Sequence, residues 1–265
     1  MTGSPTARPS SEAPVLRTIS LLEVDPDLAA DVPVEDLAEI RERTMVVAAQ
    51  FDEGPWAPAD LGPSAEDAWA ILVVDGLLLR DHVIGRTKTS ELLGPGDITS
   101  PHARHDVLLP ALVSWAVAAP TLVALLDDRF VRACATSPAI MSRLLARTAL
   151  QTTRLARQRA ISQLPRVEDR LLALFLHLGE RWGHVAPDGI ALHLVLTHEL
   201  LGRLVGARRP TVTLAIRALE EEGHVSRRDN GAWVVRHESA WRLAPNAARR
   251  KYLEERPSPH RSAWP

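Results

Sequence analysis

The sequence predicts an α+β fold in which an antiparallel β-barrel comes first, a long helix follows, and a small helical domain with a β-hairpin comes last. Three observations support this prediction. Short apolar segments between residues 45 and 126 alternate with glycine-containing turns, residues 137–163 contain no glycine, and two helical patterns separated by one glycine precede an Asn-Gly hairpin signal. The length of 265 residues fits one large domain or two modest ones.

The composition excludes several classes of protein. Hydrophobic residues make up 46% of the chain and charged residues 24%, so the chain can bury a core. Its single cysteine, Cys134, excludes an internal disulfide and a cysteine-ligated zinc or iron–sulfur site. No apolar run approaches the length of a membrane span, and residues 1–14 lack the apolar segment of a signal peptide. We therefore expect a cytoplasmic protein with no membrane partner.

The charge of the chain is unevenly distributed. The net charge is only −2 at pH 7. Residues 1–164, however, carry 15 Lys and Arg against 21 Asp and Glu, whereas residues 165–265 carry 16 against 12. Only the C-terminal part therefore favours a polyanionic partner.

Strand signals dominate the first half of the chain. Two short helices are expected within residues 21–43, and a further helix over Phe130–Ala135. Between them, apolar segments bounded by turn residues such as Asp75-Gly76 predict strands. These strands are Met45–Phe51, Trp69–Val74, Leu77–Ile84, Thr89–Leu93 and Thr121–Leu126.

The glycine-free stretch 137–163 predicts one long helix, with Pro138 in its first turn. Residues at alternating spacings of four and three form a heptad-like seam along one side. The seam consists of Met141, Leu145, Thr148, Thr152 and Leu155. Such a helix either packs on its own domain or forms a two-fold dimer, and we favour dimerisation.

Pro165 ends this helix at the point where the charge balance changes sign, so we place a domain boundary there. An amphipathic helix over 166–182 and a small hairpin up to Leu196 follow. The predicted parts are a disordered leader (1–18), a barrel domain (19–135), a dimerisation helix (136–164), a C-terminal domain (165–244) and a flexible tail (245–265).

The segment from Thr197 to Gly223 has the layout of a helix-turn-helix. Thr197 is a suitable N-cap, Gly206 suits a tight turn between helices, and Pro210 fits the first turn of the second helix. An Asn-Gly hairpin with paired arginines follows, as in a winged helix. In this arrangement the second helix enters the major groove of DNA, where the planar fork of an arginine can bond guanine.

The predicted contacts to double-stranded DNA lie at the start of the first helix, at the start of the second helix and along it, and on the hairpin. They are Thr197, Arg208, Arg209, Pro210, Thr211, Thr213, Leu214, Arg217, Arg227 and Arg228.

The stretch LTHELLGRLVGARRPTVTLAIRALEEEGHVSRR resembles the winged helix-turn-helix of the cyclic-AMP receptor protein superfamily, the Crp/Fnr-type regulators. The earlier segments AWAILVVDGLLL and ELLGPGDI resemble strand and turn patterns of that family's sensor barrel. The resemblance implies a bacterial transcription regulator with a cyclic-nucleotide-binding-like jelly-roll barrel, a dimerisation helix and a C-terminal winged helix-turn-helix.

The chain departs from the family pattern in two places. Family members that bind cyclic AMP carry a Gly-Glu cassette after the Pro-Gly-Asp turn, and this chain has no glutamate at that spacing. Gly96, Asp97 and Arg104 are the candidate effector-pocket residues, with cyclic nucleotide disfavoured and no cofactor expected. In the reading head, Arg209, Pro210 and Leu214 stand where the best-studied members have Arg, Glu and Arg, so only Arg209 carries over as a base reader.

We therefore expect a homodimer that binds a palindromic operator, with RNA polymerase and an unknown small-molecule effector as candidate partners. The barrel either senses the effector or is purely structural. The alternative is a small-molecule-binding module whose winged helix mediates protein contacts. An enzyme is not expected, because the sequence has no Gly-x-Ser-x-Gly or phosphate-binding Gly-Lys-Ser/Thr motif. The cluster His102, His105 and Asp106 and the pair His198-Glu199 lack metal-site spacing, so no metal is expected.

Overall fold

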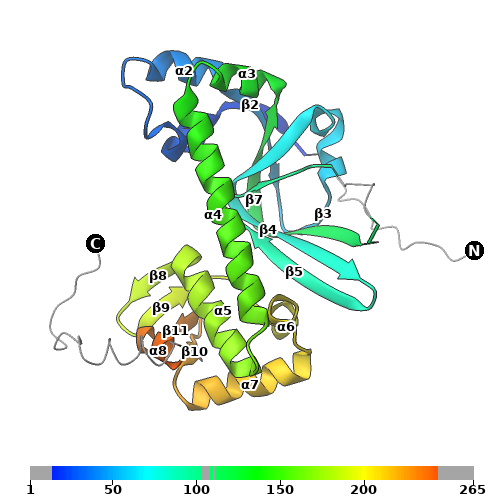
Figure 1. Ribbon diagram of the computed structural model, residues 1–265, viewed down its shortest axis with the longest axis vertical. Helices are drawn as coiled ribbons and strands as arrows, with labels where there is room; N and C mark the ends of the chain where they lie inside the picture. Colours follow the sequence, from blue (N-terminus) through cyan, green and yellow to red (C-terminus); the bar gives the residue numbers. More distant parts are fainter. Residues whose placement is uncertain (1–13, 103–107, 110, 244–265) are drawn as a thin grey trace, which may run out of the picture. The chain divides into compact units, whose positions relative to one another are not determined.

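The computed structural model describes residues 14–102, 108–109 and 111–243 (Figure 1). The chain forms two compact units, residues 1–156 and 157–265. The division falls within the long helix α4 (Pro138–Ser162). Each unit has its own sheet, and the antiparallel sheet, long helix and C-terminal helix-turn-helix that the sequence predicted are confirmed.

An antiparallel sheet of seven strands forms the centre of the N-terminal unit. Its main path runs β1-β2-β7-β4-β5, while β3 pairs with β7 and β6 with β4. The strands are β1 (Leu16–Ser20), β2 (Met45–Phe51), β3 (Gly54–Trp56), β4 (Ala68–Ile84), β5 (Thr87–Leu93), β6 (Ile98–Thr99) and β7 (Leu112–Asp127).

Strand β4 is one long strand, whereas the sequence predicted two strands with a turn at Asp75-Gly76. Its pairing with β7 shifts register several times between Val73 and Leu78, which marks an irregularity rather than a chain reversal. Gly76 has a φ of +86°, and a Cβ there would lie 2.1 Å from the backbone oxygen of Pro120. The glycine is required by this close backbone approach, which a sequence pattern does not distinguish from a turn.

Both faces of the central strands are buried, in two separate hydrophobic clusters. Leu72 and Leu126 belong to the cluster that also contains residues of the N-terminal helices. The neighbouring Ile71, Val73 and Leu125 belong to the other cluster. This alternation is the period of two expected of a strand, and it explains why these segments are apolar without interruption.

Helices cover one of these faces. They are α1 (Leu21–Val24), the 3₁₀ helix η1 (Pro26–Ala29), α2 (Leu37–Arg43), α3 (Asp128–Cys134) and the first turns of α4. Helix α3 confirms the helix predicted over Phe130–Ala135. Cys134 is fully buried beneath these helices, and burial raises the pKa of its thiol to about 12.

The C-terminal unit combines helices with a small sheet of order β10-β11-β9-β8. Phe175 and Trp233 pack within it, with their ring centroids 5.1 Å apart. The elements are α5 (Val167–Trp182), β8 (Gly183–Ala186), β9 (Gly189–Leu192), α6 (His198–Val205), α7 (Arg209–Glu221), β10 (Val225–Arg227), β11 (Trp233–Val235), the 3₁₀ helix η3 (His237–Ser239) and α8 (Ala240–Leu243).

No helix within the described part of the chain is both long enough and apolar enough to span a membrane. The five parts that the sequence predicted, with boundaries after residues 18, 135, 164 and 244, stay predictions. The leader and the tail fall largely on residues outside those the structure describes.

Candidate nucleic-acid interface

Thr197 is the N-cap of helix α6, as predicted. The Thr197 hydroxyl accepts a hydrogen bond from the backbone N–H of Leu200 at 3.1 Å, which satisfies one donor that the first turn leaves unpaired. Leu200, Leu201 and Leu204 bury the inner side of the helix. The outer side of its first turn therefore remains available to a ligand.

The connection between α6 and α7 is tight. Gly206 ends α6 in the left-handed conformation, with a φ of +67°, which confirms the predicted glycine turn. Gly202 was not singled out from the sequence, yet a Cβ there would lie 2.5 Å from the backbone oxygen of Ala207. A glycine four residues before the turn glycine was the available signal.

Helix α7 separates a buried stripe from an exposed face. Val212, Ala215, Ile216 and Leu219 are buried within the unit. The opposite face exposes six of the predicted contact residues: Arg209, Pro210, Thr211, Thr213, Leu214 and Arg217. Arg208 caps the helix in an extended conformation and is also exposed. The structure therefore brings these seven residues together on one surface.

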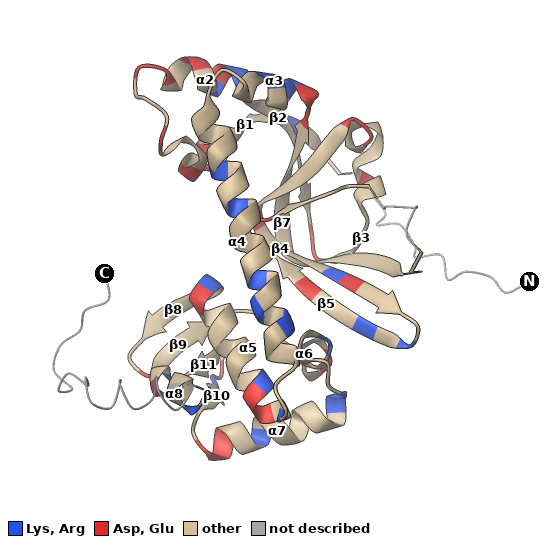
Figure 2. Ribbon diagram, in the orientation of Figure 1, with Lys and Arg blue, Asp and Glu red and all other residues tan. Residues whose placement is uncertain are grey.

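The charges along α7 follow its direction. Figure 2 shows basic residues at its N-terminal end and in its middle, and acidic residues at its C-terminal end. Arg217 lies 2.9 Å from Glu221 in an exposed i,i+4 pair, which is a weak interaction in water. Glu222 pairs with Arg242, and Arg242 also pairs with Asp169 at 3.0 Å. The acidic end is thus partly neutralised within the unit.

The two helices also meet through polar side chains. Nδ1 of His198 on α6 lies 2.9 Å from the Thr213 hydroxyl on α7, and that hydroxyl donates to the backbone oxygen of Arg209 at 3.1 Å. The sequence predicted no DNA contact for His198. Its place beside Thr197 at the start of α6 was the signal that could have assigned it to this surface.

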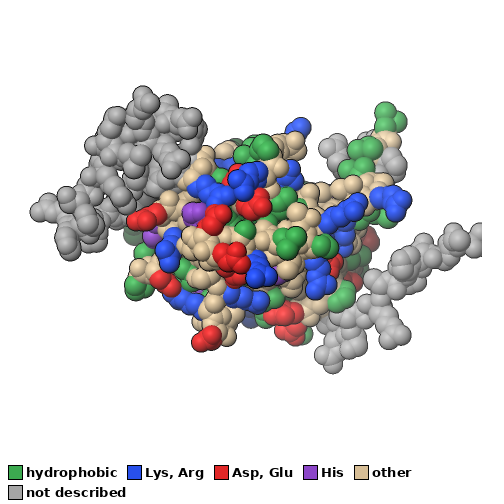
Figure 3. Space-filling model, turned by 90° about the horizontal axis from the view of Figure 1, so that it is seen from below, with side chains coloured by type: hydrophobic (Ala, Val, Ile, Leu, Met, Phe, Trp, Pro, Cys, Tyr) green, Lys and Arg blue, Asp and Glu red, His purple; other side chains and the backbone are tan. Residues whose placement is uncertain are grey.

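The hairpin β10–β11 places its two arginines differently. The Arg227 guanidinium lies 5.4 Å from the ring centroid of Trp233 and is exposed. Arg228 instead pairs with Asp188 at 2.5 Å and is half-buried. Arg227 is therefore the more available cation of the pair. Seen from below (Figure 3), basic and hydrophobic side chains are interspersed with acidic ones over the exposed surface.

The predicted seam of α4 is only partly exposed. Met141 packs against the core of the N-terminal unit, and Thr148 is half-buried. By contrast, Leu145 is 66% exposed, Leu155 is 40% exposed, and Thr152 is exposed.

The seam is only partly exposed because ion pairs hold the other side of α4 against the N-terminal unit. Arg147 bonds Asp25 at 2.5 and 2.8 Å and Asp27 at 2.9 Å, while Arg143 bonds Asp31 at 2.6 Å. The bond with Asp25 raises the pKa of Arg147, and the bond with Arg147 lowers the pKa of Asp27. These pairs hold one face of α4 against the unit and leave Leu145, Ala149, Thr152 and Ala156 on the exposed side.

Two of the candidate effector-pocket residues, Gly96 and Asp97, lie in a turn docked on α4. Asp97 is 1% exposed, its carboxylate accepts from the Gly94 N–H at 2.9 Å, and Arg154 lies 3.8 Å from it. A Cβ built on Gly96 would contact Arg147, and the Ile98 N–H donates to the Gln151 side chain at 3.1 Å. Arg104 lies outside the described residues.

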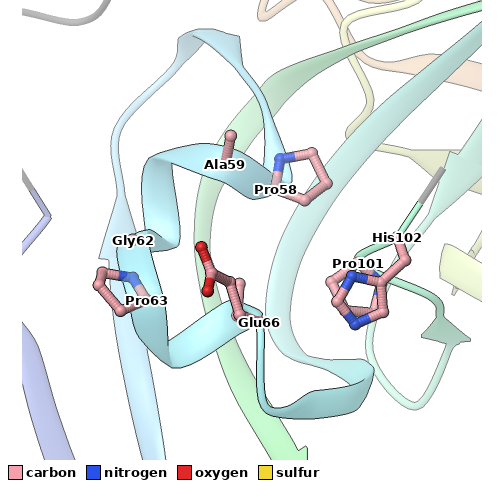
Figure 4. Close-up of a pocket in the computed structure, with 8 residues that line it drawn as sticks. Pro58, Ala59, Gly62, Pro63, Glu66, Pro101 and His102 are labelled. Atoms are coloured by element: carbon pink, nitrogen blue, oxygen red, sulfur yellow. The ribbon is translucent and has the colours of Figure 1, made fainter.

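A shallow pocket of about 500 Å³ lies elsewhere in the N-terminal unit (Figure 4). Pro101 and His102 line one side, across from Glu66 and the 3₁₀ helix η2 (Pro58–Ala65). Nε2 of His102 lies 2.9 Å from the backbone oxygen of Ala68. Within the described part of the chain, no three His, Cys, Asp or Glu residues are close enough to hold a metal ion. His105 and Asp106 lie outside that part.

The C-terminal unit resembles a known family of domains. Residues 169–240 match the model of the Crp-like helix-turn-helix domain family. The chain is 33% identical over 81 residues to the regulatory protein CysR of Synechococcus elongatus. That match spans 29% of this chain and 39% of the relative, so it concerns only part of either protein.

Solved structures resemble a larger part of the chain. A cyclic nucleotide-binding domain containing protein from Listeria monocytogenes matches with a TM-score of 0.61 at 13% identity, covering 82% of this chain and 99% of the other. A CooA mutant from Carboxydothermus hydrogenoformans matches with a TM-score of 0.58 at 16% identity, over 89% and 95%. A transcriptional regulator of the CRP family from Thermus thermophilus matches with a TM-score of 0.51 at 17% identity, covering 72% of this chain and 93% of the other. These likenesses show the fold.

Proposed function

We propose that this chain, which carries a Crp-like helix-turn-helix domain within the fold of Crp/Fnr-type regulators, is a transcription regulator that binds specific sites in double-stranded DNA. The observation that carries the proposal is the exposed face of α7. It presents arginines, threonines and one leucine on the side opposite its buried stripe, and these residues are exposed among the residues that the structure describes. Such a face suits the major groove, where a recognition helix places its N-terminal residues against base edges.

The residues on this surface divide into two roles. Arg209, in the first turn of α7, is the proposed base reader, because its guanidinium can bond O6 and N7 of guanine together. Arg208, Thr211, Thr213, Arg217 and Arg227 are proposed contacts to phosphates, which position the protein without reading sequence. Thr197 and His198 add hydrogen-bonding groups at the start of α6. Arg228 contributes less, because Asp188 already neutralises it.

The regulator acts as a homodimer on a palindromic operator. The exposed side of α4, centred on Leu145, Ala149, Thr152 and Ala156, is the proposed contact between two copies. Alternating spacings of three and four are those of a helix pair. Two-fold symmetry then sets the recognition helices about 34–36 Å apart, one turn of DNA.

The N-terminal unit is the proposed regulatory part. Its Pro-Gly-Asp turn is tied to α4 through Asp97 and through the Ile98–Gln151 hydrogen bond, so a ligand that moves this turn also acts on α4. A small-molecule effector and RNA polymerase remain proposed partners, and the cytoplasm is the proposed location. An effector would have to bind the DNA-competent arrangement more tightly than the other, with a typical coupling of about 1–3 kcal/mol.

Substitution Arg209→Ala tests the proposal. We expect it to lose discrimination at one base pair of each half-site, at a cost of about 1–3 kcal/mol on the correct base. Binding to a panel of single-base operator variants measures this loss. Arg132→Ala on α3 removes the same charge from an exposed residue of the other unit and should keep the wild-type pattern. Uniform weakening of Arg209→Ala on every sequence would instead make Arg209 a phosphate contact.

The salt dependence of binding separates DNA recognition from a winged helix that contacts only proteins. Each phosphate neutralised by an arginine releases a counterion, so log K falls steeply and linearly with log salt concentration. We expect that slope for the wild-type protein on operator and on unrelated DNA. A flat response on both would contradict the proposed function.

A further inference from the structure

Leu214 is an unusual residue for the centre of the exposed face of α7. Its side chain is 70% exposed, although the helix already has a complete buried stripe on its other side. A single exposed leucine on a protein surface needs no explanation by itself. The neighbours of Leu214 on the exposed face of α7 indicate a role for its side chain.

Residues three and four apart on a helix lie side by side. Leu214 therefore lies next to Pro210 toward the N-terminus, next to Thr211, and next to Arg217 toward the C-terminus. Pro210 is also exposed and apolar. Together the two side chains form a short apolar strip in the N-terminal half of the helix, between arginines at both ends.

The floor of the major groove offers one apolar group to such a strip. All four bases present hydrogen-bonding atoms there, and only thymine also presents a methyl group, at C5. Leucine against an amino or carbonyl group would remove that group from water without replacing its hydrogen bond, which is unfavourable. A leucine therefore favours thymine both by contact with the methyl group and by the penalty on the other bases.

We infer that Leu214 is a specificity-determining residue that contacts the 5-methyl group of one thymine in each half-site, close to the guanine bound by Arg209. This inference rests on the proposed function and deepens it, because it names a second base and the chemical group by which that base is recognised. Pro210 forms the other side of the methyl-binding strip.

The experiment uses the full-length protein and the operator obtained by selection from random DNA. Each thymine of one half-site is replaced in turn by uracil, which removes only the methyl group. Binding is measured by fluorescence anisotropy at fixed salt. For the wild-type protein we expect one position at which uracil weakens binding about fourfold, the factor that corresponds to one buried carbon.

The variant Leu214→Ala assigns the effect to this side chain. It should bind thymine and uracil equally at that position while keeping the Arg209-dependent preference for guanine. Because Leu214 is exposed and alanine favours helix, the variant should fold normally. Val185→Ala on β8 truncates another exposed apolar side chain in the same unit and should retain the uracil effect.

Two results would overturn the inference while leaving the proposed function intact. In one, the wild-type protein binds its operator but is insensitive to uracil at every position. In the other, the uracil effect persists at full size in Leu214→Ala. A protein that prefers no DNA sequence at all would overturn both the inference and the proposed function.

Discussion

At the first turn of α6, the Thr197 hydroxyl accepts the backbone N–H of Leu200 at 3.1 Å. The bond satisfies a donor of the first turn of α6, although Thr197 itself is exposed. The same hydroxyl keeps its own proton for a phosphate oxygen. One residue thus links the local fold of α6 to the proposed interface.

We expect Thr197→Ala to lower the free energy of unfolding by about 1 kcal/mol, the usual cost of a lost N-cap. Urea denaturation followed by circular dichroism measures this loss. Thr197→Ser keeps the hydroxyl and should stay close to the wild-type value. Equal losses in the two variants would mean that packing of the threonine methyl group, and not the cap, is responsible.

His82 on β4 gives a second prediction at the residue scale. Burial lowers the pKa of its imidazole below the ordinary value of 6.5, and the nearby Arg80 adds to this shift. Because the folded-state pKa is lower than the unfolded one, the unfolded chain takes up a proton first as the pH falls. The contribution of the neutral His82 imidazole to stability is therefore present above about pH 6.5 and is lost as the pH falls below that value.

We expect His82→Asn to make the free energy of unfolding less dependent on pH between about pH 7 and pH 5. Denaturation at a series of pH values measures the slope. His184→Asn, which changes an exposed histidine on β8, should keep the wild-type slope. If the free energy of unfolding of His82→Asn falls as steeply with pH as that of the wild type, burial of this imidazole does not contribute to acid sensitivity.

At the scale of elements, the helices of the C-terminal unit were predictable because their signals are local. Caps, periodic leucines and Gly206 act within one or two turns, so the positions of α5, α6 and α7 followed from the sequence. The strands were harder. The single strand β4 crosses Asp75-Gly76 because β7 lies against Gly76, and that contact comes from residues far along the chain.

The proposed interface shows the same limit. The exposed residues of α7 were predictable from helical spacing, whereas the neutralisation of Arg228 depends on Asp188, which is distant in sequence. The seam of α4 was predicted from helical spacing alone. Spacing does not reveal that Arg143 and Arg147 bond aspartates of the N-terminal segment and so turn Met141 toward the core.

We expect Leu145→Glu to produce monomers that bind the operator much more weakly, because it places a charge on the exposed side of α4. Analytical ultracentrifugation measures the association. Val34→Glu is the control, since Val34 is also an exposed apolar residue but lies outside α4. A dimer that survives in Leu145→Glu would place the contact between copies elsewhere on the chain.

At the scale of the whole molecule, the two units have different functions in the proposed regulator. The N-terminal unit holds one face of α4 through ion pairs and through the docked Pro-Gly-Asp turn. The C-terminal unit presents α7 and the hairpin to DNA. The exposed side of α4 is the proposed contact between two copies, and such a dimer would turn a weak half-site contact into a specific contact with a palindrome.

Selection of fragmented genomic DNA by the purified full-length protein tests this account most directly. The account predicts an enriched palindrome whose half-site centres lie about 34–36 Å apart, one turn of DNA. It also predicts that the palindrome enriched by Arg209→Ala has lost the base preference at one position of each half-site. Recovery of no enriched sequence at low salt, with wild-type protein and Arg209→Ala indistinguishable, would contradict it.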